Sequence, residues 1–266
     1  MTLLSKIPQA IPMPALPSRW SYSSIYLFER CPKKWHLQNA KFDFLNGEKY
    51  PQKPNLPQVQ GNLVHKLLEE WEDFVVEKVS KSGSGTDKQE ILKNFSARER
   101  ARALLKGDVA NGLEKSKRAN VKNLIGKVSL DECVQGFNRI LERRYPQEVL
   151  RVKAHPNVNS SQGERRSGGE VWLSIDDPPL FGKVDAISNG QLFEYKTGKK
   201  DEAHFEQLYF YALIHYIKFQ KLPLSLDIYY SSEDPPLYQL SADEEKIGET
   251  KEKILTTLAQ INASIE

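Results

Sequence analysis

The chain has 266 residues, of which 39% are hydrophobic and 27% charged, and its formal net charge is +3. This composition is typical of an ordinary globular protein, and the length allows one sizeable core with a second lobe. No apolar run approaches the roughly 20 residues that cross a bilayer, so we expect no membrane association. The two cysteines, Cys31 and Cys133, make a disulfide framework improbable and favour a reducing, cytoplasmic location.

The basic charge is concentrated in one segment. Residues 93–127 contain ten Lys or Arg and three Asp or Glu, a net charge of +7, which leaves −4 for the rest of the chain. Such asymmetry points towards a polyanionic partner. The alternative is a solvated helical face.

The first elements are predicted to be helical. Prolines in residues 1–20 favour an extended tail rather than a signal peptide. Ser21, Ser23 or Ser24 can cap a following helix, which Pro32 should kink or divide. After a loop rich in Gly, Asn and Pro, apolar residues at helical spacing predict a second helix over residues 59–79.

The pattern then changes from helices to strands. Residues 89–146 predict three helices, and we expect 89–147 to form an inserted basic helical lobe. Strands are predicted for "EVLRVKAHPNV", "EVWLSI", "LFGKVDAIS", "QLFEYKT" and "LSLDIYYSS", with a short strand after the last of these. Helices are predicted over about 202–220 and 243–263. The order predicts a mixed α/β domain over residues 21–266.

Charged residues interrupt the hairpin "FGKVDAISNGQLFEYKTGKK". Asp185 and Glu194 can approach each other across it, and two close carboxylates favour a divalent cation between them. Lys196 follows Glu194 by two residues and therefore shares its face, where an ammonium group can orient a water or stabilise negative charge. Tyr195 points to the opposite face, but its carbonyl oxygen is available to a metal. The alternative is an ion pair on a solvent-exposed edge hairpin.

Five motifs in order resemble the RecB-like branch of the PD-(D/E)XK nucleases. "GKVDAI" and "FEYKTG" resemble its strand motifs, "GNLVHKLLEEW" its first helical motif and "QLYFY" its Gln-x-x-x-Tyr helix. "SYSSIYLFERCPKKW" resembles the N-terminal segment with a Cys-Pro pair. The resemblance spans about residues 21–220 outside the helical insert. It implies a restriction-endonuclease-like core, with a mixed central sheet flanked by helices.

The resemblance also implies roles for individual residues. Asp185, Glu194 and Lys196 would be catalytic, and the metal ligands would be His65, Asp185, Glu194 and the Tyr195 carbonyl. Gln207, Tyr211, Glu170 and Glu69 would bind substrate or support the ligands. His65 taken alone would be a core histidine, Glu69 could instead pair with a nearby Lys, and core packing alone would explain Tyr211.

The implied function is a Mg²⁺- or Mn²⁺-dependent deoxyribonuclease for single-stranded or end-containing DNA in repair, recombination or defence. Exonuclease and endonuclease action both remain open, as does the number of metal ions. Because no Walker-type motif occurs, any helicase partner must be a separate chain. The alternative is a non-catalytic nucleic-acid-binding subunit that keeps the fold.

The cysteines and aromatic residues near the N-terminus carry two further predictions. Many relatives bind an iron–sulfur cluster through the N-terminal Cys and three more near the C-terminus, but no cysteine follows Cys133 here. We therefore expect no cluster and place Cys31 in a core. Trp20, Tyr22 and Trp35 could stack on unpaired bases, although core packing is the favoured interpretation.

Overall fold

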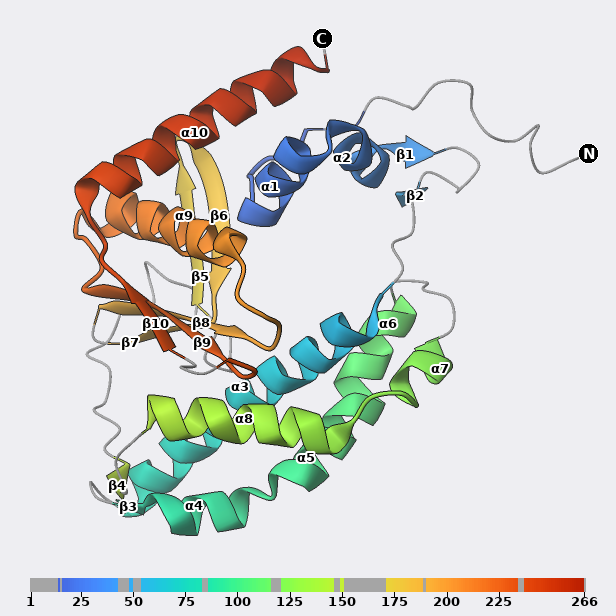
Figure 1. The fold of residues 1–266 in the computed structure, drawn as a ribbon, viewed down its shortest axis with the longest axis vertical. Helices are drawn as coiled ribbons and strands as arrows, with labels where there is room; N and C mark the ends of the chain where they lie inside the picture. Colours follow the sequence, from blue (N-terminus) through green and yellow to red (C-terminus); the bar gives the residue numbers. More distant parts are fainter. Residues whose placement is uncertain are drawn as a thin grey trace, which may run out of the picture.

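The computed structural model describes residues 14, 16–42, 48–49, 54–82, 86–115, 121–145, 149–150, 171–188, 190–233 and 237–265. A four-stranded sheet in the order β10-β9-β8-β7 lies between two layers of helices (Figure 1). Its strands are β7 (Ala186–Ser188), β8 (Gln191–Lys196), β9 (Ser225–Tyr230) and β10 (Leu237–Leu240). β8 and β9 run parallel, whereas the other two pairs are antiparallel. The predicted mixed sheet flanked by helices is confirmed.

A separate hairpin leads into this sheet. β5 (Val171–Asp176) and β6 (Pro179–Val184) pair antiparallel, and Asp185 stands between the end of β6 and the start of β7. The single strand predicted over "LFGKVDAIS" is therefore two strands that pair with different partners. The β7–β8 turn contains Gly190 with φ of 80°, a backbone conformation that favours glycine.

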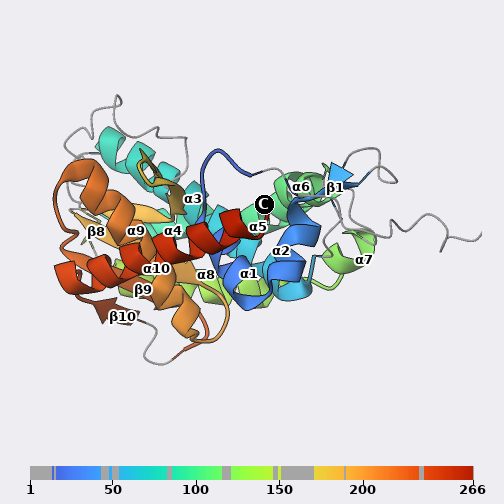
Figure 2. The ribbon, with the colours of Figure 1, turned by 90° about the horizontal axis from the view of Figure 1, so that it is seen from above.

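α9 (Glu202–Phe219) covers one face of the sheet. α10 (Glu244–Ala263) packs on α9 and runs along it to reach α1 (Tyr22–Arg30), which contacts α2 (Pro32–Asn39) (Figure 2). The Ser21 hydroxyl accepts from the Ser24 amide and caps α1, and the chain divides before Pro32 as predicted. Trp20 and Trp35 are 6% and 0% exposed and belong to the core on this face, so the favoured core interpretation is confirmed for both.

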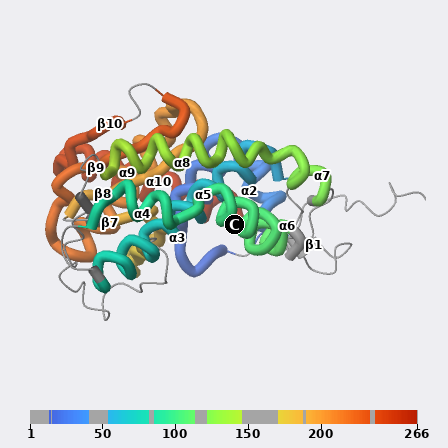
Figure 3. The backbone as a smooth tube through the Cα atoms, turned by 90° about the horizontal axis from the view of Figure 1, so that it is seen from below, coloured from blue at the N-terminus to red at the C-terminus, as the bar shows by residue number. Residues whose placement is uncertain are grey.

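The other face is covered by α3 (Leu56–Ser82) and by the segment that follows it (Figure 3). In the described part of that segment the prediction of three helices is wrong. The structure has α4 (Lys88–Phe95), α5 (Ala97–Leu104), a π-helical turn η3 (Leu105–Val109), α6 (Ala110–Lys115), α7 (Val121–Ile125) and α8 (Leu130–Arg144). Periodicity did not locate the break between α4 and α5, because it lies at a single residue, Ser96, whose φ is 52°. Trp71, Phe95 and Phe137 pack with Phe193 and Tyr195 of the sheet in one core.

Four two-residue strands complete the described chain. β1 (Lys41–Phe42) pairs with β2 (Glu48–Lys49), and β3 (Thr86–Asp87) pairs with β4 (Val149–Leu150). The strand predicted over residues 148–158 is seen only as β4, and its remainder lies outside the described residues. No described helix is long and apolar enough to cross a membrane.

One core prediction is wrong. Cys31 is exposed, whereas Cys133 is buried. Cys31 is the extended residue between α1 and α2, with φ of −160°, and this junction turns its side chain away from both packed helix faces.

Candidate active site

The alternation of side chains along β8 separates apolar from charged residues. Phe193 and Tyr195 face the core beneath α3 and α8, whereas Leu192 belongs to the core beneath α9. Glu194 lies on the same side of the strand as Leu192 and is only 3% exposed. Because β8 pairs with β7 and β9, the alternative of an exposed edge hairpin is wrong.

Asp185 joins this strand to α3. Its Oδ2 accepts a hydrogen bond from the Tyr195 amide at 2.7 Å, and its Oδ1 lies 3.2 Å from His65 Nδ1. α3 can bring His65 so close because Gly61, one turn earlier, lies against the end of β8. A Cβ atom at residue 61 would be 3.0 Å from Thr197 Oγ1.

Lys196 is held by two acceptors. Its Nζ donates to Glu194 Oε1 at 2.7 Å and to Gln207 Oε1 at 2.8 Å. Gln207 Nε2 in turn donates to the hydroxyl of Tyr211 at 2.6 Å. The structure therefore brings Gln207 and Tyr211 of α9 into one hydrogen-bonded chain with Lys196, as their spacing of four residues on the helix allows.

Comparison with known proteins places this arrangement in a family. A search of curated proteins finds no match for the chain. The profile of the PD-(D/E)XK nuclease superfamily matches residues 19–265. The chain belongs to this superfamily. Its mixed α/β architecture is accordingly a restriction-endonuclease-like fold, and PD-(D/E)XK nucleases typically use divalent metals such as Mg²⁺.

Burial and mutual charge shift the pKa values of the candidate site residues. Burial opposes protonation of His65, but the negative charges of Asp185 and Glu194 outweigh it and raise the pKa of His65 to about 9. Burial and then Asp185 raise the pKa of Glu194 to about 7 despite Lys196. Burial acts to raise the pKa of Asp185, but His65 and Lys196 together lower it. Near neutral pH, Asp185 is thus an anion paired with a cationic imidazole.

The donor chemistry of this candidate site fits a divalent cation. An imidazole and two buried carboxylates are suitable ligands for Mg²⁺ or Mn²⁺. Glu194 Oε2 is buried and has no hydrogen-bond partner within the described residues, which leaves one acceptor for a ligand to satisfy.

The contacts within the site also restrict how a cation could enter. Both Asp185 oxygens and Glu194 Oε1 are engaged by other groups of the protein. Across the described ranges, no three His, Cys, Asp or Glu side chains are arranged so that they could hold a metal ion. A cation bound by this set would therefore share oxygens that already interact with other groups of the protein.

The remaining sequence candidates lie outside this cluster or cannot be placed. Glu69 is one turn beyond His65 on α3, with its Oε2 3.8 Å from Lys66 Nζ, which is the lysine pairing weighed as its alternative. The ring of Tyr195 is buried on the opposite face, as alternation predicts. Glu170 lies outside the described residues.

Two neighbours of this candidate site were not found from the sequence. Arg144 of α8 forms an ion pair with Glu72 of α3, and its guanidinium carbon lies 5.3 Å from the centre of the Tyr195 ring. His204 of α9 lies with Nδ1 2.9 Å from the Tyr230 hydroxyl. The only sequence signal for His204 is its position one helical turn before Gln207.

Proposed function

We propose that this protein is a Mg²⁺- or Mn²⁺-dependent DNA nuclease of the RecB-like branch. Its substrate would be single-stranded or end-containing DNA in repair, recombination or defence. The observation that carries the proposal is the meeting of His65, Asp185 and the Glu194–Lys196 pair from three separate elements. Binding alone requires none of these residues in contact, whereas metal-dependent phosphodiester hydrolysis uses all of them.

His65, Asp185 and Glu194 would hold the ion, with the Tyr195 carbonyl as a further ligand. A bound divalent metal lowers the pKa of a coordinated water and neutralises charge on the phosphate. The protein contributes fixed geometry, because the Tyr195 amide holds one Asp185 oxygen and the sheet holds Glu194 out of water.

Lys196 would act on the substrate directly. Glu194 and Gln207 accept from its ammonium group and so hold it at the end of β8. From there it can orient the attacking water and stabilise negative charge as the phosphate becomes five-coordinate. Gln207 and Tyr211 would position Lys196 through their hydrogen bonds.

The helices between residues 88 and 144 supply a surface for the DNA backbone. Their exposed cations in the described part of the chain are Lys93, Arg98, Arg102, Lys106, Lys122, Lys127, Arg139 and Arg143. Contacts between such side chains and phosphates are independent of sequence and weaken with salt. A separate helicase chain would deliver the strand in pathways that require unwinding.

A non-catalytic nucleic-acid-binding subunit is the second candidate. The observation in its favour is that His65 pairs with Asp185 and Lys196 with Glu194, so that the charges are largely compensated within the protein. The same basic surface would serve such a subunit.

A cleavage assay separates the two candidates. Labelled single- and double-stranded DNA would be incubated with the protein in Mg²⁺, Mn²⁺ or EDTA, beside Lys196→Ala and the control Lys251→Ala, which changes an exposed lysine of α10. The nuclease proposal expects metal-dependent cleavage by the wild type and Lys251→Ala, and binding without cleavage by Lys196→Ala. Binding by the wild type without cleavage in either metal would identify the binding subunit instead.

A further inference from the structure

His204 lies beside Lys196 on the side of the sheet that α9 covers. Lys196 and Tyr230 are paired residues at the ends of the parallel strands β8 and β9, so their side chains project from the same face. α9 places Gln207 on Lys196 and, one turn earlier, His204 on Tyr230. Lys196 is close enough to act electrostatically on the His204 ring.

Tyr230 determines which nitrogen of His204 carries the proton. The Tyr230 hydroxyl is buried, and within the described residues its hydrogen-bond partner is His204 Nδ1 at 2.9 Å. The hydroxyl proton is therefore directed to Nδ1, and the ring proton resides on Nε2. Burial and Lys196 lower the pKa of His204 to about 4, so the ring is neutral near pH 7.

The Nε2 atom of His204 reaches solvent. It has no hydrogen-bond partner in the part of the chain that the structure describes. It is also not among the buried polar atoms that lack a partner there, which are Trp71 Nε1, Glu194 Oε2 and Tyr195 OH, so it is not buried. A neutral N–H group thus reaches solvent on the side of the sheet where Tyr230, which contacts His204, is paired with Lys196.

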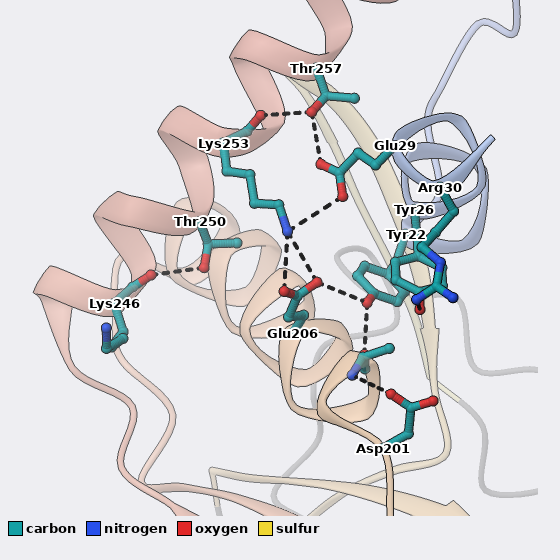
Figure 4. Close-up of polar contacts among 11 residues, drawn as sticks. Tyr22, Tyr26, Glu29, Arg30, Asp201, Glu206, Lys246, Thr250, Lys253 and Thr257 are labelled. Carbon is teal, nitrogen blue, oxygen red and sulfur yellow. Dashed lines mark hydrogen bonds and ion pairs between the residues drawn. The ribbon is translucent and has the colours of Figure 1, made fainter. Parts of the chain in front are cut away.

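The first turns of α9 are anchored to α1 and α10 (Figure 4). The Tyr22 hydroxyl donates to the Ala203 carbonyl at 2.7 Å, and Lys253 Nζ lies 3.1 Å from Glu206 and 3.4 Å from Glu29. These contacts tie α9 to α1 and α10 on either side of His204. The imidazole is therefore carried by a fixed backbone, as a binding group requires.

We infer that His204 is a substrate-binding residue whose Nε2–H donates to a phosphate oxygen of the DNA strand held at Lys196. An anionic oxygen is the acceptor that suits this position, because Lys196 attracts the phosphate and the neutral imidazole adds a directed donor without a second positive charge. The inference rests on the proposed function, since it takes DNA as the ligand.

Kinetics of variants test this role. His204→Phe keeps the ring and removes Nε2–H, and we expect KM for DNA to rise about tenfold, the loss of one hydrogen bond to a charged group. His204→Gln, which offers an amide donor, should recover most of that loss. His215→Phe is the matched control, because His215 also lies on α9 but bonds through Nδ1 to the Lys221 carbonyl at 3.0 Å. An unchanged KM for both His204 variants would overturn the inference.

A measurement without turnover separates this inference from the nuclease proposal. The wild-type protein with ¹⁵N-labelled histidine would be titrated in EDTA with a short single-stranded oligonucleotide until fluorescence anisotropy shows saturation. We expect the Nε2–H signal of His204 to shift and that of His215 to stay. If the His204 signal shifts but the protein cleaves no DNA when Mg²⁺ or Mn²⁺ is added, the His204 contact is supported and the nuclease proposal is contradicted. Cleavage without a His204 shift contradicts the contact alone.

Discussion

The ring of Tyr211 packs against the backbone of Gly182: a Cβ atom at residue 182 would lie 2.5 Å from Tyr211 Cε1 and 2.7 Å from Cδ1. Real side chains do not approach so closely, so no residue with a side chain fits at this point of β6 without displacing the ring. The Tyr211 hydroxyl accepts from Gln207, which in turn accepts from Lys196. The absence of a side chain at residue 182 therefore helps to set the position of Lys196.

Gly182→Ala should lower the free energy of unfolding by about 1–3 kcal/mol, because the added methyl group overpacks a buried contact. Urea denaturation measures the change. Gly248→Ala is the control, since no atom lies within 4 Å of a Cβ at this position of α10 and alanine favours helix by about 0.5–1 kcal/mol. A Gly182 variant as stable as the Gly248 variant would refute the contact.

The ion pair between Arg144 and Glu72 gives a second stability prediction. Their side chains are 11% and 16% exposed. Arg144→Met leaves the Glu72 carboxylate buried without its partner and should destabilise the fold by about 3–5 kcal/mol. The double variant Arg144→Met, Glu72→Met should recover much of this loss in the same denaturation assay. If the single and double variants lose the same free energy of unfolding, the ion pair does not contribute to stability.

The metal-free protein should lose stability as pH rises. Folded His65 has a pKa of about 9 against 6.5 unfolded, so its contribution is complete below pH 6.5 and disappears as pH rises through 9. The pKa of Glu194 is raised from 4.5 to about 7, so the folded state also binds an extra proton between these pH values. Glu194 therefore adds a further loss of stability as pH rises from 4.5 to 7. Urea denaturation in EDTA at pH 6 and 9 checks this. His65→Gln should remove the loss of stability above pH 6.5. If the variant shows the same dependence of stability on pH as the wild type, the loss does not come from His65.

Addition of Mn²⁺ should reverse part of that loss. Binding requires deprotonated His65 and Glu194, so the rise in melting temperature should be larger at pH 8 than at pH 6. Calorimetry in two buffers of different ionisation enthalpy should detect released protons. Asp185→Asn serves as the control and should show a much smaller rise. The same rise in both proteins would place the ion elsewhere.

The basic surface predicts a salt effect on DNA binding. Arg102 is exposed on α5, and Arg102→Ala should weaken binding and reduce the slope of log K against log salt by about one, the loss of a single phosphate contact. Fluorescence anisotropy at several salt concentrations measures both quantities. Lys251→Ala removes the same charge from α10 and should leave the slope unchanged. Identical slopes in both variants would exclude Arg102 from the interface.

Local patterns in the sequence were enough to predict the strand of the candidate site. Period-two alternation placed Glu194 and Lys196 on one side of β8, and four-residue spacing placed Gln207 and Tyr211 on one side of α9. The pairs Arg144–Glu72 and His204–Tyr230 could not be found this way, because each joins elements that are far apart in the chain. The change of strand partner at Asp185 is also invisible locally, since both strands have the same alternation.

Cys31 and the helical segment show a different limit. The burial preference of cysteine predicted a core position, but the break before Pro32 decides where that side chain points. The helix count failed because the left-handed backbone of Ser96 ends α4 and begins α5, and apolar spacing does not report the conformation of one residue. In both cases the backbone conformation decided the structure, and the preferences of single residues did not predict it.

The aromatic side chains beneath α3 and α8 have a consequence for protein engineering. Phe193, Tyr195 and Tyr229 of the sheet share one apolar cluster with Trp71 and with side chains of α4, α5 and α8. This helical segment therefore packs against one side of β8, the strand of the candidate site. A shortened chain without the segment would expose that side of the sheet, so minimal versions of this protein should shorten loops and keep those helices.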